Sequence, residues 1–256
     1  MEYHLLIKMI LQLGSMLMQS GAEIYRVEES MRRLLNAYHL ENGEVFAIPN
    51  CIIVSAELPG GRPLTKMKRI STHGTDITML EQCNALCRSL CEKTPPAKDA
   101  WNALLRLNRQ NRTYRPLLVV LGYGISPAFF ALLFGGGVAD SLCALPCGLL
   151  TGLLAQYGKR LISSNNFILT ILCSAAASFS ALLLARIVPG TSVDTITISA
   201  LMMLVPGVAI TNAMREIMAG DTFSSLAHIA DAVLCAVAIA IGSALGLSVM
   251  KFFILG

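Results

Sequence analysis

The stretch "PLLVVLGYGISPAFFALLFGGGVA", residues 116–139, contains no charged residue and is bounded by Arg115 and Asp140. It is long enough to cross about 30 Å of hydrocarbon as a helix, which takes about 20 residues. Four further uncharged windows of about 18 to 25 residues follow, bounded by Asp140 and Lys159, Arg160 and Arg186, Asp194 and Arg215, and Asp231 and Lys251. We therefore predict five transmembrane helices, at about 117–136, 141–158, 166–188, 195–214 and 228–250.

The composition supports a membrane domain. Of the 256 residues, 54% are hydrophobic and 14% are charged, whereas roughly 25% are charged in a typical soluble domain. The alternative, a set of buried helices in a large soluble core, would require all five windows to match a membrane span by chance. The charges before residue 116 are spaced regularly, as in a soluble domain. The predicted fold is an α-helical polytopic membrane domain over 116–256 behind an N-terminal cytosolic domain over 1–115.

The N-terminal domain is predicted to be α+β. The first helix is amphipathic, and Lys8 and the lack of a cleavage site argue against a signal peptide. Asp76 is positioned to cap a later helix. Helical periodicity and strand-forming composition predict helices at 1–20, 22–40, 77–93 and 97–115, and strands at 44–58 and 62–70.

Basic residues before the first span predict the orientation. Arg106, Arg109, Arg112 and Arg115 place the N-terminal domain in the cytoplasm by the positive-inside bias. Five spans then leave the C-terminus on the outer side of the membrane. Only Arg186 runs against the bias. An odd number of spans ending near Gly256 leads us to expect part of a larger transporter.

Small residues and cysteines within the chain predict packing. Three small-xxx-small pairs predict close helix contacts in the membrane: Gly148 with Gly152, Ser174 with Ser178, and Gly242 with Gly246. The eight cysteines include three at four-residue spacing on one helix face, Cys83, Cys87 and Cys91. No histidine or fourth thiol accompanies them, so buried free thiols are favoured over a metal site. No metal or cofactor is predicted.

The fourth window contains a helix break, in "MMLVPGVAITNAMREIMAGD", residues 202–221. Pro206 leaves a carbonyl near residue 202 without its helical donor, and broken helices in transporters are used to bind substrate. Arg215 could hold a carboxylate through two donors. The predicted substrate-binding residues are Thr197, Pro206, Gly207, Thr211, Asn212 and Arg215. The alternative is a structural proline kink with Arg215 at the membrane interface.

Acidic groups near the spans are candidates for proton coupling, because a charge inside a membrane is costly. Asp231 is the best placed, one turn into the last span, with His228 on the same helix face. Glu216 and Asp221 complete this set. For Asp231 and His228, the alternative is a solvated position at the membrane interface. Asp140 and Asp194 lie at outer turns and are expected to be surface charges.

Three long stretches resemble the threonine/serine exporter family: "LMMLVPGVAITNAMREIMAGDTFSSLAHIADAVLCAVAIAIGSALG", "LMQSGAEIYRVEESMRRLLNAY" and "STHGTDITMLEQCNALCRSL". Longer members carry this region fused to a second, shorter membrane domain. The resemblance therefore implies the larger half of a split exporter, with a second small membrane subunit as partner. It further implies export driven by the proton-motive force, of succinate or a related dicarboxylate in split members and of threonine or serine in fused ones.

Two other functions stay open. Ser55, His73 and Asp76 contain the residue types of a hydrolase triad, although no G-x-S-x-G pattern accompanies them. The protein could instead be a membrane-anchored sensor or scaffold whose soluble domain detects a cytosolic signal. We expect a transporter rather than an enzyme, with a small carboxylate and the lipid bilayer as partners and no nucleic acid. A homo-oligomer is left open.

Overall fold

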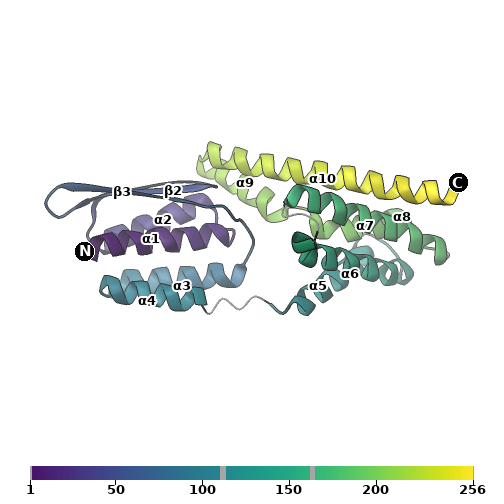
Figure 1. Cartoon of the computed structure of the whole chain (residues 1–256), viewed down its shortest axis with the longest axis horizontal. Helices are drawn as coiled ribbons and strands as arrows, with labels where there is room; N and C mark the ends of the chain where they lie inside the picture. Colours follow the sequence, from purple (N-terminus) through teal and green to yellow (C-terminus); the bar gives the residue numbers. More distant parts are fainter. Residues whose placement is uncertain (1, 110–113, 162–164, 256) are drawn as a thin grey trace. The chain divides into compact units, whose positions relative to one another are not determined.

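The computed structural model describes residues 2–109, 114–161 and 165–255. Its elements group into two compact units (Figure 1). The first unit comprises Met1–Arg112 and Val208–Ala230, and the second comprises Thr113–Gly207 and Asp231–Gly256. Residues 208–230 therefore pack with the N-terminal region, although in sequence they lie within the predicted membrane domain 116–256.

Helices and a small sheet form three layers in the first unit (Figure 1). The bounds are α1 Glu2–Gln19, α2 Ile24–Ala37, β1 Glu41–Ile48, β2 Cys51–Leu58, β3 Arg62–Arg69, α3 Ile77–Lys93 and α4 Ala97–Arg109. Helices α1 and α2 form the middle layer, between the sheet and the α3–α4 pair. The sheet is antiparallel, with the strand order β1-β2-β3.

Helix α1 is the core of this unit, which explains its apolar composition. Ile7, Met9, Ile10 and Leu13 are completely buried, although they do not all lie on one helix face. Because α1 is covered by the sheet on one side and by α3 and α4 on the other, most of its circumference must be apolar.

Local sequence patterns predicted most of the helices and strands of the N-terminal region. The Asp76 side chain accepts a hydrogen bond from the Met79 backbone N–H at 2.9 Å, which confirms the predicted cap of α3. One prediction was wrong: residues 44–58 do not form a single strand. A turn at Pro49 and Asn50 divides them, and the pairing of Ile48 with Cys51 closes a hairpin of β1 and β2. The sheet therefore has three strands.

The second unit is a helical bundle. It contains α5 Pro116–Leu133, α6 Val138–Leu161, α7 Asn166–Ile187, α8 Val193–Leu201, the 3₁₀-helix η1 Met202–Leu204, and the part of α10 (Thr222–Leu255) from residue 231 onward. Large apolar side chains such as Leu117, Phe129, Leu133 and Leu142 are exposed on its surface. Such a surface suits a lipid environment, because lipid does not penalise exposed apolar groups.

The predicted small-residue contacts are present. A Cβ atom at Gly148 would clash with the Tyr123 backbone of α5, and one at Gly242 would clash with Ser174 of α7. The Ser178 hydroxyl donates a hydrogen bond to Ser243 at 2.9 Å, which joins α7 to α10. Small residues thus let these helices approach closely, as expected for packing within a bilayer.

Four helices are long and apolar enough to cross a membrane: α5, α6 to Gly158, α7, and α10 to Met250. The predicted fourth span, 195–214, is instead divided between α8, η1 and α9 (Gly207–Ala219), because Pro206 interrupts it. Counting this broken pair as one span gives five. The protein is thus a multi-pass membrane protein with four or five spans among the described residues.

Asp140 is not the surface charge that we predicted from the sequence. Its side chain is buried and accepts hydrogen bonds from the backbone N–H groups of Gly137 at 2.8 Å and Ser192 at 2.7 Å. Asp140 therefore joins the α5–α6 turn to the turn that precedes α8. A buried carboxylate in this position satisfies backbone donors that would otherwise lack partners.

Candidate functional site

At the helix break before Pro206, local hydrogen bonds satisfy the backbone carbonyls. The chain leaves the helical path after η1, and α9 begins again at Gly207. The Met202 carbonyl accepts a hydrogen bond from the Val205 N–H at 3.3 Å, so the 3₁₀ turn supplies a donor to the carbonyl that we expected to be free. The Leu204 carbonyl accepts from the Cys235 thiol at 3.5 Å. Both carbonyls are therefore satisfied within the second unit.

Helix α9 presents Asn212, Arg215 and Glu216 on one face, because residues three and four apart are neighbours on a helix. This face contacts the corner between α1 and α2 in the first unit. The Asn212 amide is buried and donates a hydrogen bond to the Gly21 carbonyl at 3.0 Å. The predicted substrate residue Asn212 thus has a structural partner, which ties α9 to the N-terminal fold.

Glu216 is the centre of this contact. Its side chain is completely buried and accepts hydrogen bonds from the Ile24 backbone N–H at 3.2 Å and from Nδ1 of His228 at 2.7 Å. Ile24 is the first residue of α2, where a backbone N–H lacks a partner within its helix and the helix dipole favours a negative charge. The carboxylate and imidazole therefore form a hydrogen-bonded pair whose acidic member is completely buried.

A second charged pair lies beside Glu216. Arg215 contacts Oε1 of Glu23 through one guanidinium nitrogen at 2.5 Å, and Arg26 lies 3.5 Å from the other carboxylate oxygen. The Glu23 side chain is 8% exposed, whereas that of Arg215 is 55% exposed. Burial by itself raises the pKa of Glu23, but hydrogen bonds from its own N–H and from Arg215, with the nearby positive charges, outweigh burial and hold that pKa below its usual value.

The other predicted site residues are dispersed. Thr197 on α8 is buried, and its hydroxyl has no hydrogen-bond partner among the described residues. Thr211 is exposed on α9. Asp221 accepts from the Ser224 N–H at 3.2 Å and so caps the start of α10. Asp231 is exposed and lies beyond this cap.

The structure thus brings together four of the predicted residues, Asn212, Arg215, Glu216 and His228, around the α1–α2 corner. Sequence reasoning did not identify Glu23 as their partner. Its only local signal is an acidic residue immediately before an amphipathic helix, at the N-cap of α2. That position is compatible with a role inside α2 alone, so the contact with α9 could not be predicted from it.

Ser55, His73 and Asp76, the residues of the hydrolase alternative, do not form a catalytic triad. The Ser55 hydroxyl pairs with the Thr65 hydroxyl at 2.9 Å, and Nε2 of His73 lies 2.7 Å from the Pro49 carbonyl. Asp76 caps α3. Each of the three side chains therefore has a separate structural partner, and no nucleophile–base pair forms from them.

Comparison with known proteins identifies one family and several relatives. Residues 8–250 match the family described as "Putative threonine/serine exporter". A protein of Klebsiella aerogenes named "Probable succinate transporter subunit YjjP" is 26% identical, over 94% of this chain and 92% of that protein. Its namesake in Escherichia coli K12 is 27% identical, over 94% and 93%.

A third relative is longer. The Mycobacterium tuberculosis protein named "Probable threonine/serine exporter" is 22% identical over 91% of this chain, which corresponds to 44% of that protein. No solved structure matches. These are names of transporters and exporters, so the chain falls in a transporter family rather than an enzyme family.

Proposed function

We propose that this chain, which belongs to the threonine/serine exporter family, is one subunit of a secondary transporter that exports a small carboxylate. The first choice of substrate is succinate or a related dicarboxylate, because the relatives matched over nearly their whole length are named as succinate transporter subunits. Threonine or serine is the second choice, since the relative with that name is matched over less than half its length. A second small membrane protein completes the transporter.

The observation that carries this proposal is the interruption of an apolar helix at Pro206, flanked by polar residues. Transporters use broken helices to place polar groups within the membrane. Thr197, on the N-terminal side of the break, has a buried hydroxyl without a partner among the described residues. An unpaired buried hydroxyl is costly, and a polar solute would satisfy it.

Arg215 is the proposed carboxylate ligand on the C-terminal side of the break. A guanidinium group carries five N–H donors, and the contact with Glu23 involves one nitrogen. Because the Arg215 side chain is more than half exposed, it can meet a substrate while Glu23 holds it in place. Thr211 and Gly207 remain proposed contributors near the break, whereas the Asn212 amide serves mainly to bind Gly21.

Proton coupling is best assigned to Glu216 and His228. Glu216 is completely buried and is hydrogen-bonded to the half-buried His228, so a change of protonation would alter contacts with α2. Asp231 was the first choice from the sequence. Its side chain is exposed, however, so a change in its protonation would disturb fewer contacts within the protein. We propose that the proton-motive force drives export through this pair. The proposed location is the inner membrane, with the N-terminus cytoplasmic and the C-terminus periplasmic.

The test is flux in proteoliposomes. Labelled succinate, threonine and serine are offered to vesicles holding this chain alone, or this chain with its small membrane partner. We expect succinate flux that depends on a pH gradient and requires both proteins. Full flux from this chain alone would refute the subunit proposal. Flux of threonine or serine without succinate would reverse the order of substrates.

A further inference from the structure

Three lysines gather on the side of the first unit where α1 lies between β3 and α4. Lys8 belongs to α1, and Lys66 and Lys68 belong to β3. The Lys66 ammonium donates a hydrogen bond to the His4 carbonyl at 3.2 Å, and the Lys68 ammonium donates to the side-chain oxygen of Gln12. Because His4, Lys8 and Gln12 follow one another at four-residue spacing, Lys8 lies between these two contacts along α1. We call the three residues the lysine cluster.

The alternation of side chains along β3 brings its two lysines to the same face of the sheet. Successive side chains of a strand point to opposite faces. Lys66 and Lys68 are half-buried on the face that contacts α1, whereas Met67 and Arg69 are exposed on the open face. Four of the eight residues of β3 are basic and none is acidic. The strand therefore brings positive charge to α1 without an acid of its own.

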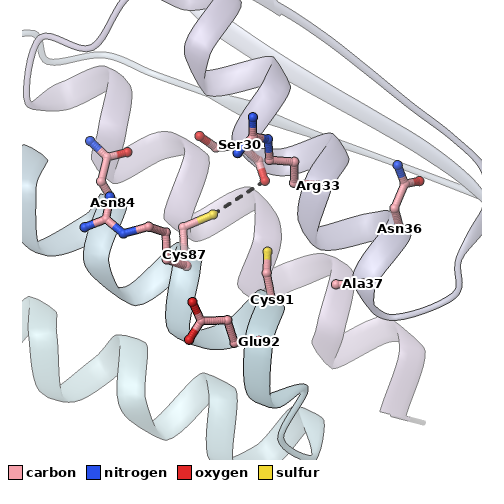
Figure 2. Close-up of a pocket in the computed structure, with 9 residues that line it drawn as sticks. Ser30, Arg33, Asn36, Ala37, Asn84, Cys87, Cys91 and Glu92 are labelled. Atoms are coloured by element: carbon pink, nitrogen blue, oxygen red, sulfur yellow. Dashed lines mark hydrogen bonds between the residues drawn. The ribbon is translucent and has the colours of Figure 1, made fainter.

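The lysine cluster differs from other basic side chains of the first unit in its partners. Arg33, which lines the groove between α2 and α3, is paired with Glu29 at 2.6 Å, and Glu92 lines the same groove (Figure 2). None of the three lysines forms an ion pair with a carboxylate in the part of the chain that the structure describes. The acceptors of the two β3 lysines are a carbonyl and an amide oxygen, which are uncharged. The positive charge of the cluster is therefore not neutralised by these contacts.

The surroundings of Lys68 make its charged form costly. Burial of its side chain and the positive charge of Lys8 both lower the pKa of Lys68 below the ordinary value of a lysine. Lys8 itself lies over Trp101 of α4, with 4.9 Å between its ammonium and the centre of the ring. A cation–π contact of this kind stabilises an ammonium group but leaves its charge in place. An anion bound between the lysines would relieve their repulsion.

We propose that the lysine cluster binds a phosphate monoester group, carried either by a soluble molecule or by the headgroup of a lipid. Such a group has a charge of about −1.5 to −2 at pH 7 and three acceptor oxygens. An ammonium group carries three donors, so the β3 lysines can bind the anion while they keep their contacts with α1. A carboxylate offers only two oxygens to the three lysines. The cluster does not include Arg215, so this site does not depend on the proposed transport role.

Fluorescence of the full-length protein tests this proposal, because Trp101 is the only tryptophan and Lys8 lies over its ring. In detergent, the protein is titrated with inorganic phosphate, and sodium chloride of equal ionic strength controls for screening. In phosphatidylcholine nanodiscs, the emission is compared with and without phosphatidic acid, whose headgroup is a phosphate monoester. A saturable change with inorganic phosphate identifies a soluble ligand. A change with phosphatidic acid alone identifies a lipid.

Two lysine variants and one matched control place the binding at the cluster. Lys66→Gln and Lys68→Gln should each raise the half-saturating concentration about threefold to tenfold, as for loss of one charge-assisted contact near water. Arg69→Gln removes the same charge from the same strand but from the open face, so it should change that concentration by less than about twofold.

Several results would overturn the proposal. They are no saturable response to phosphate or phosphatidic acid, an equal response to succinate, unchanged binding in both lysine variants, and a loss in Arg69→Gln as large as theirs. The last result would show that the protein attracts anions only through its general positive charge. Succinate flux in vesicles is measured separately, so a failure of the transport proposal would leave this result unaffected.

Discussion

Replacing Glu216 tests whether the contact between α9 and the α1–α2 corner holds the first unit together. Glu216→Gln keeps the shape of the side chain and can still accept from the Ile24 N–H, but it loses the negative charge that faces His228. Glu216→Ala removes both acceptors. It leaves a buried backbone N–H and an imidazole nitrogen without their partner.

The expected losses in the free energy of unfolding follow from these contacts. A hydrogen bond that involves a charged group contributes about 1.5–3 kcal/mol, against about 1 kcal/mol for a neutral one. A negative charge at a helix N-terminus adds about 0.3–1 kcal/mol. We therefore expect Glu216→Gln to lower the free energy of unfolding by about 1–3 kcal/mol. Glu216→Ala should cost about 3–5 kcal/mol, the range for removing one partner of a buried pair.

The single tryptophan makes this effect measurable. Trp101 lies on α4 of the first unit, and its fluorescence therefore reports on unfolding of that unit. Denaturant titrations of the full-length protein in detergent compare the wild type with both variants. Glu29→Gln is the control, since Glu29 is exposed and should change stability by less than about 0.5 kcal/mol.

A double-mutant cycle with His228→Ala isolates the carboxylate–imidazole interaction. We expect a coupling energy of at least about 1 kcal/mol between Glu216 and His228, because the two groups are 2.7 Å apart and Glu216 is fully buried. Additive losses would show that the two residues act independently. If both Glu216 variants cost no more than Glu29→Gln, this contact does not support the fold and the reasoning is refuted.

Four other variants test separate parts of the structure. Arg215→Lys keeps the charge but loses the planar guanidinium, so the apparent KM for succinate should rise about tenfold; an unchanged KM would exclude a carboxylate role. Pro206→Ala should allow a continuous helix and reduce flux at equal abundance, whereas full flux would make the break structural only. Gly242→Leu should clash with Ser174 and lower stability by about 1–3 kcal/mol, which should appear as a lower aggregation temperature on heating; an unchanged temperature would contradict the α7–α10 contact. Because the pKa of Glu23 is lowered in the folded state, its carboxylate stabilises the fold above the ordinary pKa of a glutamate, and this gain is lost as the pH falls through the lower, folded-state pKa. Glu23→Gln should therefore flatten that part of the pH–stability curve.

Several features of this protein could be determined from its sequence because their causes are local. A span requires about 20 consecutive apolar residues, and uncharged windows of that length occur where α5, α6, α7 and α10 lie. Proline removes a backbone donor wherever it stands, so the break before Gly207 follows from Pro206 itself. The cap at Asp76 likewise depends on a residue only three positions away.

The site depended on tertiary structure, because burial and pairing are set by distant parts of the chain. Glu216 and Asp231 are both acids in the same apolar region, and nothing in their neighbours distinguishes them. Folding brings Ile24, 192 residues away in sequence, against Glu216, and leaves Asp231 exposed. Glu23 meets Arg215 over the same separation. Periodicity shows which face of a helix is polar, but only the packing of α9 against the α1–α2 corner decides which polar group is buried and what it binds.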